Sequence, residues 1–575
     1  MIKTAVCIIL AYVSYIALFS RTATFFIPTH YFGGAVFIVA TVWLYYKHDH
    51  KQIRRAECVF SVLLSLAHML GLTFTRYDSF AMFTAGRVNI LFFFVMLAGF
   101  IPFFYVITCL LVDKVLACKI EPHDEGRFSQ FFAPFVLFLA AWLPYFIIYF
   151  PGNLINDAVR QLAQVEGITP FINAHPLYST FFLGSFYRLG ILLGNANLGL
   201  AFITIVHNVM MAAGFSLTLM YLKKWGVNYR VRLGVMVFYA AFPVFGIWAQ
   251  TILKDTSAAV FMLLFILFYI DLAKEFTRKK LVLCFVAAIV ASLFRSEVVF
   301  VVVPSIFALG IFYAQKNRRF VLMGSAIAVF IAVRLLVGGA MAITNAQSGS
   351  VRDVISIPIQ QTARFMRYHE DRITPEERAV LAATFEDYYM IGELYHPRIS
   401  DPVKDLFIEG TDLGAYLRTW AAMGLRAPRA YIEAAIAVSF SYVVPFGPDW
   451  MIVWRESSHE AIQVLERDDI GYVFSTYGMR IFPARVMEVV ERLPFVGFFF
   501  HTGNYTWAMA FLVLLLIKRK LWREIIYFLP ALMIILACIA SPVHGFWRYY
   551  LSILYMFPVL LTVIFAKLNT TDIVT

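Results

Sequence analysis

Acidic, amide and cationic side chains recur at helical spacing just after a long apolar run. The stretch is PGNLINDAVRQLAQVEGITPFINAHPLY, residues 151–178, and within it Asp157, Gln161 and Gln164 stand at positions i, i+4 and i+7. Residues at this spacing share one face of an α-helix, and Arg160 lies beside that face. The pattern predicts a short helix whose polar side carries a carboxylate, two amides and a guanidinium. A carboxylate held in this way can act as a general base, which contributes about 10²–10⁴ in rate.

The residues around this helix indicate where it begins and ends. Asn156 is suited to cap its start, and Gly167 is a suitable C-terminal stop. His175 and Pro176 follow in the sequence NAHPLYST, where the proline is suited to open the next helix. An imidazole would thus stand near the carboxylate, although a histidine at a helix end is more often a structural residue than a ligand.

Four further charged residues, Lys254, Asp255, Arg295 and Arg548, lie near the ends of later apolar runs. An isolated charge in the middle of a bilayer costs about 2.5–3.5 kcal/mol on insertion scales, so charges at this boundary need a partner. A phosphate group at the membrane surface would be such a partner. The candidates for binding such a phosphate group are Arg160, Gln161, His175, Lys254, Asp255, Arg295 and Arg548.

Each of these residues also has a purely structural interpretation. Asp255 is a good cap for the helix that follows it, and Lys254 could extend its ammonium group to the membrane surface. Arg295 could pair with the glutamate two residues later in FRSE. The sequence HGFWRYY, which contains Arg548, is typical of an aromatic belt at a membrane interface. Composition and spacing leave both interpretations open.

The composition places the chain in the polytopic membrane class. Of its 575 residues, 61% are hydrophobic and only 15% are charged, whereas soluble proteins average about 25% charged residues. The net charge of +12 comes from short basic clusters between apolar runs, and six such clusters hold 22 of the 48 Lys and Arg residues. Nucleic-acid binding would require one basic face or stripe, which this distribution does not provide. The six cysteines are scattered without the spacing of a metal or redox site.

The basic clusters also orient the chain, because Lys and Arg accumulate in cytoplasmic loops. They predict an all-α fold of about fourteen transmembrane helices with both termini in the cytoplasm. Residue 151 is then on the outer side, where 177–193 is expected to form a juxtamembrane or re-entrant helix. The run 431–446 is expected to be interfacial, because counting it as a span would reverse the side of the next basic loop.

This topology divides the chain into four parts. The third part holds 21 of the 36 acidic residues and contains a Thr-Pro-Glu-Glu helix start at Thr374. It is therefore expected to be a mainly helical extracytoplasmic domain. The predicted parts are N-terminal transmembrane helices (1–129), a transmembrane core (130–338) with a catalytic outer loop (151–197), the extracytoplasmic domain (339–500) and C-terminal transmembrane helices (501–575).

The motifs together resemble those of a family of bacterial polytopic membrane proteins. They are ND-x-x-RQ-x-x-x-x-x-G from Asn156, N-x-HP-x-x-x-T from Asn173, FPVFGIWAQTILKD, FRSE, and QQTAR…MIGELYHPRISDPVK, and the resemblance covers most of residues 130–560. Members of that family look like GT-C glycosyltransferases, the fold class of protein O-mannosyltransferases and aminoarabinose transferases of lipid A. The likeness to GT-C enzymes depends on the acidic first outer loop, the juxtamembrane helix and the alternating topology.

The resemblance implies a sugar transfer on the extracytoplasmic side of the bacterial cytoplasmic membrane. The donor would be a polyprenyl-phosphate-linked sugar, and the acceptor a cell-envelope glycan, lipid or protein. Asp157 would take the proton of the attacking hydroxyl, with inversion at the anomeric carbon. GT-C families often carry a second acidic residue beside the first, but here Ala158 follows. We therefore assign no metal ligands, and a divalent metal is the one cofactor left open.

Three other functions fit parts of the pattern. A transporter or flippase of a lipid-linked glycan would place paired ionisable residues at mid-membrane, whereas here they cluster at the outer boundary. A glycan polymerase or ligase would need an Arg-rich outer loop and little contribution from Asp157. A receptor or assembly factor without catalysis has no specific motif in its favour. The arginines that keep the ligase alternative open are Arg364, Arg367, Arg372 and Arg378.

Overall fold

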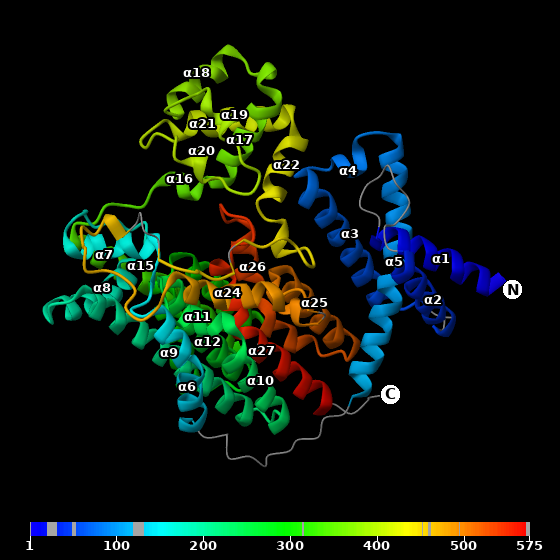
Figure 1. Cartoon of the computed structure of the whole chain (residues 1–575), viewed down its shortest axis with the longest axis horizontal. Helices are drawn as coiled ribbons and strands as arrows, with labels where there is room; N and C mark the ends of the chain where they lie inside the picture. The colour runs from blue at the N-terminus through cyan, green and yellow to red at the C-terminus, as the bar shows by residue number, and fades with distance from the viewer. Residues whose placement is uncertain are drawn as a thin grey trace.

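In the part of the chain that the computed structural model describes, the regular elements are helices apart from one pair of very short strands (Figure 1). The predicted all-α class is therefore confirmed. Residue 1, the residues after 570 and the basic loop at 119–130 lie outside the described residues, so the predicted location of the termini does too. The structure describes residues 2–19, 31–48, 53–118, 131–312, 316–450, 452–457, 462–493 and 495–570.

Eight helical segments of the described chain are long and apolar enough to cross a membrane, or nine if one bent pair counts as a span. The chain is thus a multi-pass membrane protein, and the eight form part of the predicted set of about fourteen. They are α3 (Arg55–Tyr77), α5 (Arg87–Ala117), α6 (Phe132–Tyr149), α9 (Ala196–Lys224), α12 (Lys254–Lys274), α15 (Lys316–Thr344), η6 with α26 (Trp522–Phe528 and Leu529–Ile539) and α27 (Trp547–Thr570).

Shorter helices complete the bundle. The bent pair is α10 (Tyr229–Ala241) followed by α11 (Pro243–Ala249), whose axes differ by 54°. Phe242 between them has an extended backbone, and the proline that follows begins the second helix. The other apolar helices are α1 (Ile2–Phe19), α2 (Tyr31–Lys47), α13 (Arg278–Phe294), η2 (Ser296–Val298) with α14 (Val299–Phe312), and α25 (Thr502–Lys518).

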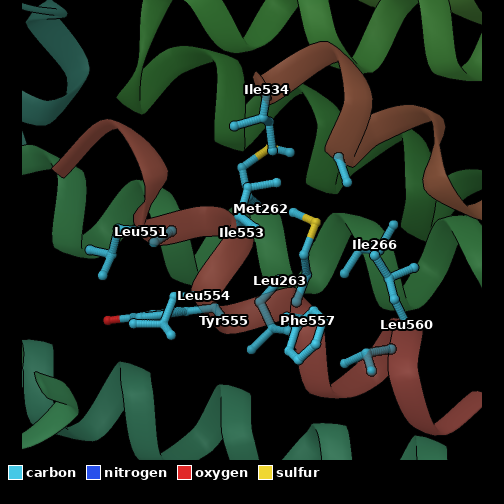
Figure 2. Packing of buried hydrophobic residues seen from close by; sticks show 14 of the residues in the cluster. Met262, Leu263, Ile266, Ile534, Leu551, Ile553, Leu554, Tyr555, Phe557 and Leu560 are labelled. Carbon is cyan, nitrogen blue, oxygen red and sulfur yellow. The ribbon is translucent and has the colours of Figure 1, made fainter. Parts of the chain in front are cut away.

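α12 and α27 form the centre of the bundle. In each, 78% of the most apolar stretch is buried inside the protein, against 22% in α6 and in α15. A helix that is apolar on all sides can be buried on all sides, and α12 is apolar from Ala258 to Ile270. Figure 2 shows Met262 and Ile266 of α12 packed between Leu554 and Leu560 of α27 and Ile534 of α26.

Two helices follow α6 and lie across the end of the bundle. α7 (Asn156–Glu166) is the predicted amphipathic helix, and Gly167 ends it with a φ of 78°, as predicted. The prediction that Asn156 caps it is wrong: Ile155 occupies that position, because the chain up to Leu154 is held extended in a strand.

The run predicted over 177–193 is α8 (Leu177–Leu192), which at 16 residues is shorter than a membrane crossing requires. It packs closely on α9 because both helices place a glycine at the contact. A methyl group built on Gly190 would lie 1.9 Å from the backbone nitrogen of Gly199. This contact fixes α8 against the start of a membrane-spanning helix.

The two strands are parallel and join the segment after α6 to the segment before α12. β1 (Asn153–Leu154) pairs with β2 (Thr251–Ile252) in the register Asn153 to Thr251 and Leu154 to Ile252. We use the term site face for the end of the bundle at which α6 ends and α9, α12 and α27 begin.

A separate group of short helices stands away from the bundle on the site face (Figure 1). These helices pack around a hydrophobic cluster of their own, in which Ile359, Phe365 and Tyr416 are fully buried. They are α16 (Val351–Val354), α17 (Ser356–His369), η3 (Glu370–Arg372), α18 (Pro375–Thr384), α19 (Met390–Glu393), α20 (Asp401–Lys404), α21 (Leu413–Arg426) and α22 (Pro428–Ala437).

The predicted helix start at Thr374 is confirmed as a capping box. The Thr374 hydroxyl accepts from the backbone N–H of Glu377, whose side chain accepts in return from the backbone of Thr374. The run 431–446 is divided between α22 and η4 (Phe440–Tyr442), so it is not one continuous membrane-spanning helix.

A hydrogen bond to a buried glutamate and an ion pair join this group of helices to the N-terminal part of the chain. Glu433 of α22 pairs with Arg364 of α17 and also accepts at 2.9 Å from the backbone N–H of Phe80. Asp78 lies 3.4 Å from Arg398. Phe80 comes directly before α4 (Ala81–Thr84). The remaining elements on the site face are α24 (Tyr477–Val490) and η5 (Val496–Phe500), which precede α25.

Candidate functional site

Two helices begin side by side because the strands before them are paired. β1 leads into α7 and β2 leads into α12. Because the two strands are paired, the first turns of these two helices lie next to each other. Asp157 is the second residue of α7, and Asp255 is the second residue of α12. The positive ends of two helix dipoles therefore meet on the site face, and each first turn carries a carboxylate.

Asp157 accepts from two cationic side chains that come from distant parts of the chain. Its Oδ2 atom lies 2.7 Å from Nζ of Lys254 and 2.6 Å from Nη2 of Arg548. His175 completes the group, with its Nδ1 atom 3.2 Å from the same Lys254 nitrogen and 3.8 Å from the Asp157 carboxylate. Asp157 and Lys254 lie in the first turns of the helices that follow the two paired strands. His175 lies in the loop before α8, and Arg548 lies in the first turn of α27.

Asp255 forms a second group that shares Arg548. Its Oδ1 atom lies 2.8 Å from Nη1 of Arg295, and its Oδ2 atom lies 3.7 Å from Nε of Arg548. Arg295 follows directly after α13 and also pairs with Glu297. The ring of Tyr549 lies within 5.2 Å of both guanidinium groups. The two groups form one network of three carboxylates, three cations and one imidazole.

Most of the network is shielded from solvent, although the side chain of Glu297 is 48% exposed. The side chains of Lys254, Arg295 and Arg548 are 9%, 11% and 12% exposed, and that of Asp255 is 1% exposed. Charges removed from water are costly unless each has a partner of opposite sign. Here the formal charges of the three carboxylates and three cations cancel. Each ion therefore has a neighbour of opposite charge within the network.

The surroundings shift the pKa values of Asp157 and His175. Burial raises the pKa of Asp157, but Arg548 and Lys254 outweigh this effect and hold it well below its ordinary value. Burial, together with the positive charge of Lys254, lowers the pKa of His175 to about 4. At neutral pH, Asp157 is an anion and His175 is a neutral imidazole that can accept a hydrogen bond from Lys254.

Chemically, this arrangement suits an anion more than a metal ion. The carboxylates of Asp157 and Asp255 already face cationic side chains at the positions where a metal would bind. Among the described residues, no three His, Cys, Asp or Glu side chains are grouped in a way that would hold a metal. Two helix N-termini and three cations, by contrast, are the elements of a phosphate site.

The structure brings together six of the eight residues chosen from the sequence, and Arg160 and Gln161 are not among the six. Arg160 is exposed on α7. Gln161 is buried and donates to Ser179 at 2.8 Å and to Thr180 at 2.9 Å, so it holds α7 against α8. The six that converge are Asp157, His175, Lys254, Asp255, Arg295 and Arg548.

One member of the network, Glu297, and the tyrosine that packs against it, Tyr549, are not among the candidate site residues. Glu297 was noted in FRSE only as a possible partner of Arg295, and its position two residues later was the signal available. Tyr549 was grouped with an aromatic belt, and no pattern in the sequence distinguishes it from the many other tyrosines.

The comparisons with known proteins give a family but no activity. No curated protein and no solved structure matches the chain. One family model matches residues 165–572, which contain every member of the network except Asp157. Because this match covers well over half of the sequence, the chain belongs to the family described as "Family of unknown function (DUF6020)".

Proposed function

We propose that this protein is a membrane glycosyltransferase that uses a polyprenyl-phosphate-linked sugar and acts by inversion, with Asp157 as the general base. The observation that supports this most directly is the position of Asp157 between Lys254 and Arg548 at two convergent helix N-termini. A carboxylate beside a set of cations is what transfer from a phosphate leaving group requires. The GT-C likeness of the sequence supports the same assignment.

In the proposed step, the acceptor hydroxyl passes its proton to a carboxylate oxygen of Asp157. The acceptor oxygen bonds to the anomeric carbon on the side opposite the phosphate. The bond between that carbon and the phosphate oxygen breaks, and its electron pair stays on the oxygen. The products are the glycosylated acceptor, a polyprenyl phosphate with one more negative charge than the donor phosphate, and protonated Asp157, which then loses its proton to water.

The cations would change partners as the donor binds. With Lys254 and Arg548 both engaged, the pKa of Asp157 is too low for an efficient base. A phosphate that draws these two cations away would leave Asp157 with fewer opposite charges, so its pKa would rise toward the ordinary value. In this proposal, donor binding both places the leaving group and activates the base.

We further propose that the site face is extracytoplasmic in the bacterial cytoplasmic membrane and that both termini are cytoplasmic. Under this topology the chain has about fourteen spans, in keeping with the positive-inside distribution of Lys and Arg. The 339–500 segment would select a cell-envelope glycan, lipid or protein as acceptor. Deleting the α16–α22 helices without any loss of acceptor discrimination would contradict this last part.

The test is a transfer assay on purified protein. A panel of polyprenyl-phosphate sugars is offered with membrane-extracted glycopolymer acceptors, and release of polyprenyl phosphate is measured for wild type and Asp157→Asn. The control is Asp468→Asn, which removes a carboxylate from an exposed position. Turnover by wild type and the control, lost in the Asp157 variant, is the expected result. Turnover that survives Asp157→Asn would remove the assigned base.

The assay also separates the alternatives. Substrate-dependent thermal stabilisation without turnover from any donor would favour a transporter or flippase. Transfer of whole oligosaccharides independent of Asp157 would favour a polymerase or ligase. Two of the four arginines that keep the ligase alternative open are paired within the α16–α22 group, Arg364 with Glu433 and Arg367 with Glu393.

A further inference from the structure

α24 presents two different apolar sides. One side is buried against the protein through Ala484 and Met487, each 4% exposed. The other side is open: Phe482 is 64% exposed and Val489 is 63% exposed. Met479 and Val486 lie on the same open side, since the four residues are spaced at intervals of three and four. A helix this apolar on its exposed side requires a partner other than water.

Both ends of the α24 region lie at the boundary of the bundle. Near its start, the Tyr149 hydroxyl at the end of α6 donates to the backbone carbonyl of Arg480 at 2.8 Å. Beyond its end, the ring of Phe500 lies 5.0 Å from that of Phe242, at the site-face end of α10. α25 then begins at Thr502. The helix therefore runs along the site face between the ends of membrane-spanning helices instead of pointing away from them.

α6, whose end contacts the start of α24, also exposes apolar side chains. On α6, Leu143 and Ile147 are 52% and 47% exposed, six and two residues before Tyr149. At the edge of the open side of α24 stands Arg485, three residues after Phe482 and four before Val489, and its side chain is exposed. Arginine at the edge of an apolar helix face can extend to lipid phosphates while the apolar residues enter the acyl region.

We propose that α24 lies in the headgroup region of the bilayer leaflet on the site face, with Met479, Phe482, Val486 and Val489 inserted among the acyl chains. Arg485 reaches the lipid phosphates from the edge of this surface. The partner is the lipid bilayer itself, and no second protein chain is required.

The segment that precedes α24 transmits this position to the candidate site. The Ser457 hydroxyl accepts at 2.8 Å from the backbone N–H of Leu154, and the Tyr472 hydroxyl lies 2.7 Å from the Asn153 side chain. Both contacts are to β1, three or four residues before Asp157. Insertion of α24 therefore sets the depth at which β1 and α7 are held relative to the lipid headgroups.

The test uses the full-length chain in nanodiscs of phosphatidylethanolamine and phosphatidylglycerol. A photoreactive benzophenone analogue of phenylalanine is placed at Phe482 or at Val489, both exposed positions whose replacement leaves the packed side of α24 unchanged. Ile147 on α6 is the positive control. Tyr389, 77% exposed at the start of α19 in the separate group of helices, is the negative control. Lipid adducts are counted by mass spectrometry after illumination.

We expect lipid adducts at Phe482 and Val489 at a level similar to Ile147 and well above Tyr389. Adducts at Ile147 without adducts at either α24 position would overturn the proposal. Covalent dimers of the chain through Phe482 or Val489 would also overturn it, because the open side would then be an interface between copies. Samples are compared only when they elute as a single species, and the two α24 positions are independent of one another.

Discussion

Asp157 and Asp255 are the second residues of two helices that begin side by side, and the guanidinium of Arg548 lies between their carboxylates. The two aspartates are electrostatically coupled, because a change at one alters how Arg548 interacts with the other. The site is therefore one electrostatic unit, and its variants are expected to affect binding and stability together.

Removing the charge of Asp157 should strengthen the binding of a phosphate ligand. Asp157 competes for Lys254 and Arg548, so Asp157→Asn leaves both cations available. We expect a short-chain polyprenyl monophosphate to bind the variant on the order of 10-fold more tightly, or about 1.4 kcal/mol. Titration calorimetry in nanodiscs measures this. Weaker binding by the variant would mean that Asp157 supports the ligand directly, and absence of binding by wild type would instead count against the proposed donor.

Arg548→Met should destabilise the folded protein strongly. It leaves Asp157 with one cationic partner and removes the shared cation from Asp255, which is almost completely buried. Breaking a buried ion pair in this way costs about 3–5 kcal/mol. Arg160→Met is the matched control, because Arg160 is exposed, and exposed charges contribute about 0–1 kcal/mol. Thermal unfolding in detergent compares the two variants, and equal unfolding midpoints would show that the network contributes little.

His175 should make the protein less stable as the pH falls. Its pKa in the folded state is about 4, below the ordinary value of 6.5, so between these values the unfolded chain binds more protons. Stability is then lost as the pH drops from 6.5 toward 4, with a slope approaching about 1.4 kcal/mol per pH unit. His175→Asn keeps an acceptor near Nδ1 but cannot titrate. The difference in unfolding midpoint between wild type and this variant should therefore change between pH 6.5 and pH 4. A difference that stays constant over this range would contradict the assigned role of His175.

Asp449 should have the opposite effect. Burial raises the pKa of this carboxyl to about 7, although it accepts from the backbone N–H of Thr502 at 2.6 Å and from its hydroxyl at 2.8 Å. The folded state then binds more protons than the unfolded state between pH about 4 and 7, so stability falls as the pH rises through this range. Asp449→Asn resembles the protonated form and should remove this slope. Unfolding midpoints of both proteins at pH 5 and pH 8 test the direction of this pH dependence. A variant whose midpoint shifts with pH as much as that of wild type would show that Asp449 is not its cause.

The sequence was most informative where a local rule decides the structure. Gly167 ends α7 because a left-handed residue is needed there, and Thr374 begins α18 through contacts within four residues. The membrane class follows from composition. The sequence predicts only part of the charged network. Each charge near the end of an apolar run needed a partner, but the identity of that partner depends on which helix ends are neighbours.

The strand ladder could not be predicted. β1 and β2 have two residues each, too few for an alternating pattern, and the residues that pair are 98 positions apart in the sequence. The same ladder explains the incorrect cap. Extension of the chain through Leu154 moves the cap of α7 from Asn156 to Ile155.

The contact between Asp157 and Arg548 joins residues 391 positions apart. During synthesis, α7 is made long before α27. Asp157 therefore lacks its second cationic partner, Arg548, until nearly all later helices have been inserted. Until then the half-built site carries an excess of negative charge close to the membrane surface. Insertion of α27 brings Arg548 and removes that excess, so the network becomes electrically neutral only when α27 has taken its place.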